Sequence, residues 1–219
     1  MSDLTVYGNV FSQPTRSVLT FCRLSGIEHT HKDLNFLKGE HMSKEFTLIN
    51  PFQAMPAIVH GTFNLWESAA IVSYLADAYN VDNQWYPKDF KIRARINAYL
   101  HWHHQGTRGS IVNYLVAKLF APKFGAPELT EETEAPYKAK LEEWYQTFTW
   151  LLSETHYVAR TNMPTIADVF AYNEVFNALP IMNLDAHPAI KAWFDEISAV
   201  PIIREIGQEA QEVYRKFLA

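Results

Sequence analysis

The sequence predicts an α/β domain followed by an all-helical domain, and three observations carry this prediction. In the N-terminal part, short β-rich runs alternate with helical segments. Residues 80–89 (NVDNQWYPKD) are polar and contain a proline, which is typical of a link between domains. From Phe90 onward, apolar residues recur at helical spacing and the β signals fade. The predicted segments are a first domain at 1–80, a linker at 81–89 and a helical domain at 90–219.

The first domain is expected to contain a small sheet and two helices. β-forming residues gather in short runs bounded by turn residues, which places strands at residues 4–8, 29–34 and 57–66. The last run has a turn at His60-Gly61 in its middle, so we expect a hairpin there. Apolar residues at helical spacing predict a helix that begins at Gln13-Pro14 and another over residues 67–79.

The second domain shows the apolar spacing of packed helices. Two stripes are clear: Leu141, Trp144, Tyr145, Phe148, Leu151 and Leu152, and then Ile190, Trp193, Phe194 and Ile197. Thr165 stands before another apolar run, with Asp168 three positions later. This spacing predicts a capped helix start, because each side chain can bond the backbone N–H of the other residue. The domain is therefore expected to be an all-helical bundle.

Composition and charge are those of an ordinary globular chain. Of the 219 residues, 48% are hydrophobic and 20% are charged, and the formal net charge is -5. A negative charge gives no electrostatic support for binding nucleic acid. No apolar run approaches the length of about 18 residues that a membrane span needs, and the N-terminus lacks the apolar region of a secretory signal. Because Cys22 is the single cysteine, we expect no internal disulfide and a cytoplasmic location.

The stretch NVFSQPTRSVLTFC (residues 9–22) places a serine immediately before a helix start. Proline is accepted in the first turn of a helix, where its missing N–H would have no partner. Ser12 therefore lies at a helix N-terminus, where free backbone N–H groups and the helix dipole favour negative charge. From these residues alone two interpretations stay open, a helix-capping serine and a hydroxyl that serves an anionic ligand.

Motifs spread over the chain resemble those of the glutathione transferase family. Three segments occur in the family's order: SQPTR (12–16), NPFQAMPAIVHGTFNLWES (50–68) and PTIADV (164–169). Two more segments are similar to the theta-like group, whose active-site residue is a serine: KGEHMSKEF (38–46) and WHHQGTRGS (102–110). The resemblance covers nearly the whole chain. It implies a thioredoxin-like N-terminal domain, a helical C-terminal domain that forms the electrophile pocket, and glutathione as co-substrate.

The resemblance also implies a glutathione site in the first domain. Pro56 matches a proline that is cis in the family and turns the main chain of Met55 outward, to pair with the cysteinyl unit of glutathione. Ser68 is implied to hold the γ-glutamyl carboxylate and Glu67 the ammonium group of that unit. His41 is implied to contact the glycyl carboxylate. By residue type alone, Glu67 and Ser68 also fit a helix start, and His41 also fits a solvated loop.

Three further residues complete the implied glutathione site: Gln13, Gln53 and Arg108. Ala54 and Ala69 stand where relatives often carry polar or charged side chains, so binding of the glycyl unit is expected to depend on His41 and Gln53. Arg108 matches an arginine that theta-like relatives place near the active site. A solvated helix charge is an equal alternative for this arginine.

Tyr7 competes with Ser12 for the catalytic role. It ends the first predicted strand, at about the place where other transferase classes use a tyrosine, but a strand tyrosine also simply packs from one face. Ser12 is the predicted catalytic residue because it shares the electropositive helix start. It has no partner base, so its hydroxyl is expected to donate to the thiolate of glutathione rather than to accept a proton.

No metal site is expected. His101, His103 and His104 lie close together, and the first and last share a helical face. Because no carboxylate or cysteine lies nearby at ligand spacing, we expect packing or surface roles for these histidines. Cys22 lies on the apolar run of the first helix and is expected to be a buried, inert thiol.

Together these features predict an enzyme of the glutathione S-transferase type. It would conjugate glutathione to small electrophiles such as halides and epoxides, or reduce peroxides. Two alternatives stay open: a glutathione-dependent disulfide reductase, and a non-catalytic interaction module with the same fold. The resemblance also implies a homodimer. Phe52 is either an apolar anchor of its interface or an exposed loop aromatic.

Overall fold

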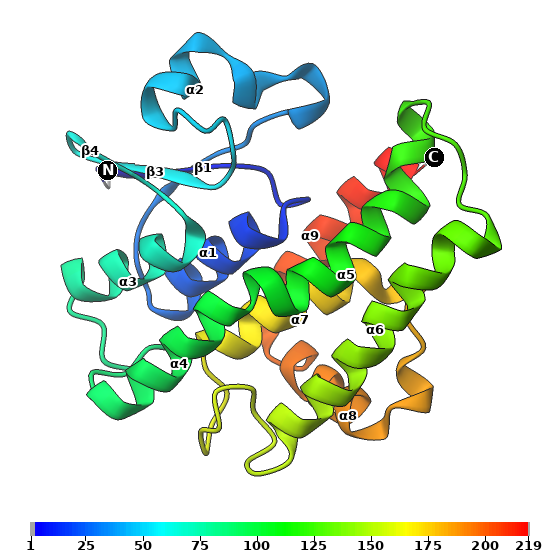
Figure 1. Cartoon of the computed structure of the whole chain (residues 1–219). Helices are drawn as coiled ribbons and strands as arrows, with labels where there is room; N and C mark the ends of the chain where they lie inside the picture. Colours follow the sequence, from blue (N-terminus) through cyan, green and yellow to red (C-terminus); the bar gives the residue numbers. More distant parts are fainter. Residues whose placement is uncertain (1–2, 219) are drawn as a thin grey trace. The chain divides into compact units, whose positions relative to one another are not determined.

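The computed structural model describes residues 3–218 of the chain (Figure 1). The chain divides into two compact units. The first comprises Met1–Arg93 and Ala199–Ala219, and the second comprises Ala94–Ser198. The sheet lies in the first unit, and the described residues of the second unit form helices and connecting loops. The predicted succession of an α/β part and a helical part is confirmed.

A four-stranded sheet forms the centre of the first unit. Its strands are β1 (Leu4–Tyr7), β2 (Thr30–Lys32), β3 (Ala57–His60) and β4 (Phe63–Trp66), in the order β2-β1-β3-β4. β1 runs parallel to β2 and antiparallel to β3, and β3 forms the predicted hairpin with β4. The three strand regions expected from the sequence are therefore confirmed.

Helices cover both faces of this sheet (Figure 1). The helical elements of the first unit are α1 (Gln13–Leu24), η1 (Phe36–Lys38), η2 (Glu40–Met42), α2 (Lys44–Ile49), α3 (Ser68–Ala78) and α9 (Pro201–Leu218). α1 and α3 pack together on one face, and α2 lies on the other. Side chains of β1 alternate between these faces. Leu4 and Val6 are fully buried, and the Tyr7 ring packs against Phe46 of α2.

The last helix packs with the first unit, although the sequence pattern predicted one helical domain over residues 90–219. α9 contacts α1. Arg23 pairs with Glu209 at 3.0 Å, and the rings of Phe11 and Tyr214 stack with centroids 4.5 Å apart. Helical periodicity shows that a segment is helical, but it does not show which other element covers its apolar face. The domain boundaries at residues 80 and 90 stay a prediction.

The second unit is a bundle of helices. Its elements are α4 (Phe90–Trp102), which begins in the first unit, η3 (His104–Arg108), α5 (Gly109–Leu115), η4 (Val116–Phe120), η5 (Ala121–Phe124), α6 (Glu131–Leu152), α7 (Ile166–Ala178), η6 (Leu179–Ile181), η7 (Leu184–Ala186) and α8 (Pro188–Ser198). α5 packs on α6 and α7, and α8 packs on the same two helices. η3 and η4 are turns of π-helix, which often occur at functional sites.

The aromatic core of the second unit comes from the two predicted stripes. Trp144 stacks on Phe148 with centroids 4.5 Å apart, and Phe148 meets the edge of Trp193 at 4.9 Å. The predicted cap of α7 is also present. The Thr165 hydroxyl accepts from the backbone N–H of Asp168, and the Asp168 carboxylate accepts from the backbone N–H of Thr165. Asp168 also accepts a hydrogen bond from the Trp193 indole at 3.0 Å. The cap therefore ties α7 to α8.

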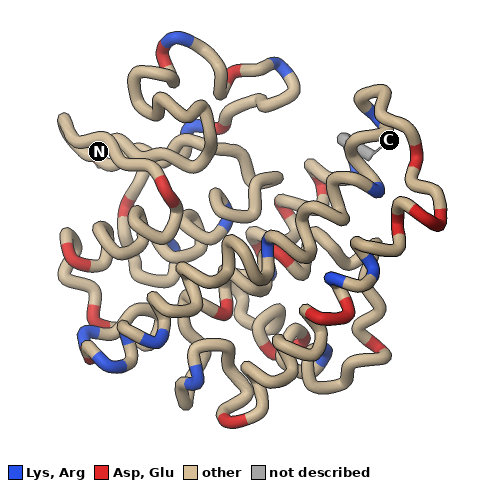
Figure 2. Tube along the Cα trace, in the orientation of Figure 1, with Lys and Arg blue, Asp and Glu red and all other residues tan. Residues whose placement is uncertain are grey.

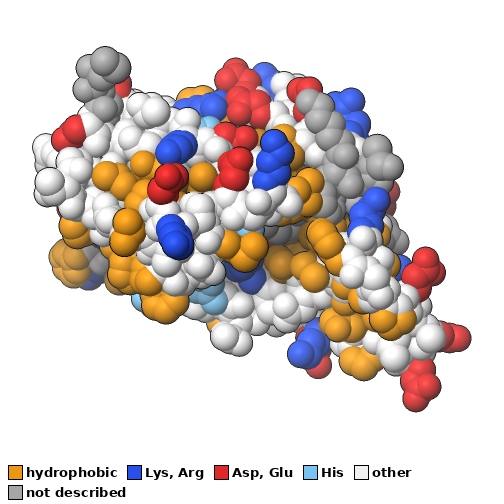
Figure 3. All heavy atoms as spheres, turned by 90° about the horizontal axis from the view of Figure 1, so that it is seen from above, with side chains coloured by type: hydrophobic (Ala, Val, Ile, Leu, Met, Phe, Trp, Pro, Cys, Tyr) orange, Lys and Arg blue, Asp and Glu red, His pale blue; other side chains and the backbone are white. Residues whose placement is uncertain are grey.

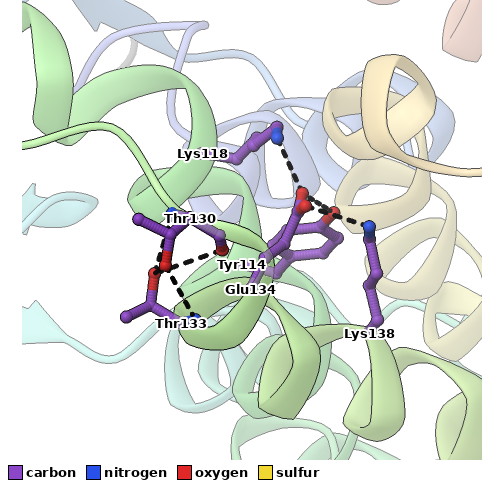
Figure 4. A network of polar contacts seen from close by, with 6 residues as sticks. All are labelled: Tyr114, Lys118, Thr130, Thr133, Glu134 and Lys138. Carbon is purple, nitrogen blue, oxygen red and sulfur yellow. Dashed lines mark hydrogen bonds and ion pairs between the residues drawn. The ribbon is translucent and has the colours of Figure 1, made fainter.

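A charged network joins α5 and η4 to α6 (Figure 4). The buried carboxylate of Glu134 accepts hydrogen bonds from the Tyr114 hydroxyl at 2.6 Å, from Lys118 at 2.7 Å and from Lys138 at 2.9 Å. These three donors hold the pKa of Glu134 down at about 2. A sequence pattern could not single out this carboxylate, because two of its partners lie on other elements.

Charged residues of both signs are spread along the trace, with no long run of one sign (Figure 2). The space-filling view shows hydrophobic side chains in patches with charged side chains among them (Figure 3). Two exposed hydrophobic residues of the first unit are Leu48 and Phe52, with 83% and 70% of their surface accessible. Among the described residues, no helix combines the length and the apolar character that a membrane span requires.

Candidate active site

Four chain segments meet at one end of the sheet. Tyr7, the last residue of β1, lies opposite Ala57, the first residue of β3, and Ala57 lies opposite Trp66, the last residue of β4. The loop after β1, the segment before β3 and the segment after β4 therefore lie at the same end of the sheet. Lys32, the last residue of β2, also pairs with Tyr7, so the chain that leads to His41 leaves the sheet at that end too. This register brings the predicted glutathione residues of the first domain to one end of the sheet.

Ser12 caps helix α1. Its backbone is extended, with φ -73° and ψ 119°, and its Oγ accepts a hydrogen bond from the Thr15 N–H at 3.4 Å. The predicted proline, Pro14, lies in the first turn. Within residues 3–218, no acceptor takes the hydroxyl hydrogen of Ser12. The side chain therefore uses a lone pair to cap the helix and keeps its O–H for another group.

Gln13 follows as the first residue of α1, and its side chain is largely buried. The loop in front of it packs closely on the helix. Gly8 has φ +156°, and a Cβ on this residue would lie 2.5 Å from Thr15 Oγ1. Only glycine fits this close approach. The loop that carries Ser12 is therefore fixed against the first turn of α1.

The peptide bond between Met55 and Pro56 is cis, as the resemblance implies. Pro56 is buried and Met55 is half-buried, immediately before the first ladder position of β3. In the described part of the chain, neither the N–H nor the C=O of Met55 takes part in a hydrogen bond. An extended peptide can bond both groups in the manner of an added strand.

Glu67 and Ser68 form the start of α3. Glu67 has φ +68° and ψ 108°, an unusual conformation for a residue other than glycine, and its exposed carboxylate makes no capping bond to the helix. Backbone strain of this kind is found at ligand-binding positions. Ser68 is the first residue of the helix and is buried. Its N–H and hydroxyl lie at the positive end of the helix dipole, which suits a carboxylate.

His41 and Gln53 lie in the two loops on either side of α2. His41 is half-buried in η2, and its Nδ1 is buried without a hydrogen-bond partner among the described residues. Gln53 is exposed at φ +55°, and its amide nitrogen donates to Thr47 Oγ1 at 3.1 Å. In this conformation the amide of Gln53 is partly committed to α2.

Tyr7 packs on the face of the sheet that α2 covers. Its ring packs against Phe46 on the face that α2 covers, and the Lys32 ammonium lies 5.2 Å from the ring centroid. Tyr7 also lines a cavity of about 290 Å³ with residues of η2 and α2, and Ser12 is not part of that lining. The alternation of the strand accounts for this, because Tyr7 points to the opposite face from Leu4 and Val6.

Arg108 lies in the second unit and forms an ion pair inside it. Its guanidinium lies 2.5 Å from Glu174 Oε1, and the side chain of Glu174 is 1% exposed. A simple solvated helix charge therefore does not describe Arg108. The pairing carboxylate comes from α7, 66 positions along the chain, so the sequence pattern could not reveal it. The implied contact of Arg108 with glutathione stays a prediction.

The three neighbouring histidines differ in their surroundings. His103 is fully buried against Phe170, and burial together with the positive charges near it lowers its pKa to about 3. His101 is exposed and bonds the carbonyl of Asn97 at 2.7 Å. Over the residues that the structure describes, no group of three or more histidine, cysteine or acidic side chains is arranged to hold a metal.

Cys22 is completely buried in α1, as predicted. Burial raises the pKa of this thiol to about 12. The thiolate is the reactive form of cysteine, so this side chain is inert at neutral pH.

Sequence reasoning missed the residues that support the site. Asn50 is buried and donates to the Ala54 carbonyl at 2.6 Å, which shapes the loop before Met55. Asn9 makes a hydrogen bond within the loop that carries Ser12, and Arg16 contacts that loop from α1. For Arg16 a signal existed in the sequence, because an arginine stands at the start of an otherwise apolar helical run.

Comparisons with known proteins agree with this geometry. Residues 2–77 match the family model described as the glutathione S-transferase N-terminal domain. The chain is 32% identical to glutathione S-transferase theta-1 of Mus musculus, over 97% of this chain and 89% of the relative. The apo form of human glutathione-S-transferase T1-1 superposes with a TM-score of 0.87 at 30% identity, over 96% of this chain and 88% of that one.

A third comparison concerns a human theta-class glutathione transferase in complex with the glutathione conjugate of 1-menaphthyl sulfate. It superposes with a TM-score of 0.85 at 28% identity, over 100% of this chain and 92% of that one. These relatives confirm the predicted fold class, a thioredoxin-like N-terminal domain followed by a helical C-terminal domain. The chain therefore belongs to the glutathione S-transferase family, with homologues in its theta class.

Proposed function

We propose that this chain binds glutathione at the end of its sheet and directs the glutathione thiolate at a small electrophile, with Ser12 as the stabilising hydroxyl. One observation carries the proposal. At this end of the sheet, the hydroxyl of Ser12 lies at a helix N-terminus with its O–H uncommitted. The Met55–Pro56 and Glu67–Ser68 pairs lie next to the strand ends on the same side.

The known magnitudes of these interactions are sufficient for thiolate formation. A free cysteine thiol has a pKa of about 8.5, and each unit of depression needs about 1.4 kcal/mol. A hydrogen bond to a charged group contributes roughly 1.5–3 kcal/mol, and a helix N-terminus adds roughly 0.3–1 kcal/mol. Together they lower the thiol pKa by about two units, which populates the thiolate at neutral pH. Ser12 acts as a donor to the thiolate.

Each part of glutathione has a partner of suitable chemistry. The main chain of Met55 suits the cysteinyl unit, and Ser68 suits the γ-glutamyl carboxylate at the start of α3. Glu67 suits the ammonium group, and His41 suits the glycyl carboxylate. The human theta-class relative that holds a glutathione conjugate supports glutathione as the co-substrate. Gln13, Gln53 and Arg108 are secondary contacts in this proposal.

One thiolate serves several reactions. With an alkyl or aryl halide, a carbon–sulfur bond forms and the halide leaves. With an epoxide, a carbon–sulfur bond forms as the carbon–oxygen bond opens, and the alkoxide takes a proton from water. With a peroxide, a sulfur–oxygen bond forms as the oxygen–oxygen bond breaks, and the leaving alkoxide takes a proton from water. A second glutathione then converts the resulting sulfenic acid to glutathione disulfide and releases water. We propose that residues of the helical domain form the electrophile pocket and select among these substrates.

The active form is proposed to be a homodimer with two-fold symmetry. Phe52 supports this, because a large aromatic ring with 70% of its surface accessible is costly to leave in water. It lies in the loop before Met55, with its ring 5.7 Å from that of Trp66. Burial of this ring against a second copy would give the interface an apolar anchor.

A glutathione-affinity column followed by a panel of electrophiles tests the function. We expect retention on the column and formation of conjugates with a halide or an epoxide. Turnover of small mixed disulfides without conjugation would instead identify a disulfide reductase. The absence of both retention and turnover would indicate a non-catalytic module and would overturn the proposal.

A further inference from the structure

Arg16 is an unusual residue for the interior of a protein. It lies in the first turns of α1 and is 0% exposed, among the largest fully buried side chains of the described chain. Burying a guanidinium costs free energy unless its donors are satisfied by well-placed acceptors. Such a group is therefore expected to have a specific task in its surroundings.

Arg16 makes three hydrogen bonds to the loop that carries Ser12. Its Nη1 donates to the carbonyl of Val10 at 2.7 Å and to that of Phe11 at 3.2 Å. Its backbone N–H donates to the carbonyl of Ser12 at 3.0 Å. The side chain thus bonds two consecutive carbonyls of the loop, and the backbone N–H of the same residue makes the first i→i−4 bond of α1, to the carbonyl of Ser12.

We propose that Arg16 is a positioning residue for glutathione activation, which holds the β1–α1 loop so that the Ser12 hydroxyl points at the thiolate. The inference rests on the proposed function of Ser12. A donor must meet a developing charge at hydrogen-bond distance, and a displacement of about 1 Å removes much of the effect. The backbone of Ser12 is held by bonds to Asn9 and Arg16, so its geometry follows that of the loop.

The planar fork of arginine suits this task better than any other cation. Both side-chain bonds come from one nitrogen, Nη1, whose two N–H bonds lie in the plane of the guanidinium and point in different directions, so it serves the neighbouring carbonyls of Val10 and Phe11. Lysine keeps the charge but concentrates its donors on one tetrahedral nitrogen. Arg16→Lys therefore tests the geometry of the contacts while the charge is retained.

The experiment measures the thiol pKa of bound glutathione, from the ultraviolet absorbance of the thiolate against pH, together with kcat and KM. For Arg16→Lys we expect a thiol pKa about one unit higher and kcat about tenfold lower. KM for glutathione should stay within about twofold, because the γ-glutamyl and glycyl contacts are untouched. A merely structural role would lower the melting temperature and leave the thiol pKa unchanged.

A double-mutant cycle with Ser12→Ala tests whether Arg16 acts through Ser12. If it does, Arg16→Lys has little further effect on kcat in the Ser12→Ala background. Losses that multiply in the double variant would show an independent action and overturn the proposal. Arg23→Lys is the matched control. Arg23 lies on the same helix, pairs with Glu209 at the surface, and should give wild-type kinetics.

A second variant keeps the test decisive if Arg16→Lys does not fold. Asn9 belongs to the same loop and ties it to the chain after β2, because its Oδ1 accepts from the Phe11 N–H at 2.8 Å and its Nδ2 donates to Asp33 at 2.7 Å. Asn9→Ala should raise the thiol pKa in the same direction. If the folded Asn9→Ala variant has the wild-type thiol pKa, the position of the loop does not control the thiol pKa and the proposal fails.

Failure of the proposed function looks different from failure of this inference. If wild-type protein forms no conjugate, or if Ser12→Ala is fully active, the role of Ser12 is wrong. If Ser12→Ala loses activity while Arg16→Lys keeps both activity and thiol pKa, Ser12 keeps its role and Arg16 is only structural.

Discussion

The backbone N–H of Thr15 donates to Ser12 Oγ across 3.4 Å, a longer distance than the roughly 2.7–3.2 Å of ordinary N–H···O bonds. The cap is therefore weak, and loss of the Ser12 side chain should cost the fold little, near the lower end of about 0.5–2 kcal/mol for N-cap substitutions. Stability and catalysis can thus be separated at this residue.

Ser12→Ala should lower turnover with a small electrophile by about tenfold or more, a loss near 1.4 kcal/mol. The physical reason is the missing hydrogen bond to the thiolate, whose pKa should rise. Glutathione binding should change much less, since the contacts at both ends of the tripeptide remain. Steady-state kinetics and a melting curve of the same preparation measure the two effects.

Tyr7→Phe is the matched control for Ser12→Ala. Its ring packs against Phe46 of α2 and lines a cavity to which Ser12 does not contribute, so most of the activity should remain. Abolished turnover in Tyr7→Phe, with Ser12→Ala still active, would assign the catalytic hydroxyl to Tyr7 and leave Ser12 as a cap.

Glu67→Gln should raise the dissociation constant for glutathione by about tenfold, because it removes the charge partner of the γ-glutamyl ammonium group. Glutamine keeps the size of the side chain at a backbone position with φ +68°. Titration calorimetry measures the change. Glu45→Gln, an exposed residue of α2, is the control with an expected wild-type affinity. Equal affinities for all three proteins would exclude the ligand role of Glu67.

Phe52→Ser should weaken the proposed dimer, because it removes the apolar anchor. Sedimentation at micromolar concentration should show a dimer for the wild type and a larger monomer fraction for the variant. Leu48→Ser is a suitable control, since Leu48 is the more exposed of the two at 83%. A wild-type protein that sediments as a monomer would contradict the proposed assembly.

The lowered pKa of Glu134 predicts that the free energy of unfolding depends on pH. Its folded pKa is about 2, below the ordinary value of 4.5. The charged carboxylate therefore stabilises the fold above about pH 4.5, and this stabilisation is lost as the pH falls toward 2. Glu134→Gln should have a lower urea midpoint than the wild type at pH 7, and the difference should shrink below pH 4.5. A difference that stays constant down to the acid range would show that the network does not stabilise the fold.

Local patterns in the sequence predicted much of the fold. The start of α1 follows from a proline in its first turn, and the start of α7 follows from Thr165 and Asp168 three positions apart. Strands and amphipathic helices are also recognisable in the sequence, because their periods of about two and 3.6 residues depend only on neighbouring positions. The candidate site residues came from motifs of contiguous residues, and their roles stay predictions.

The sequence by itself determined the α/β and helical order, the family motifs and the position of Ser12 at a helix start. Tertiary structure alone decided the contacts between distant residues, such as Arg108 with Glu174 and α9 with α1. It also decided that Arg16 is buried and turned toward the Ser12 loop. The physical reason is that helix and strand propensity act between near neighbours, whereas the burial of a charge depends on which acceptors the whole fold brings to it.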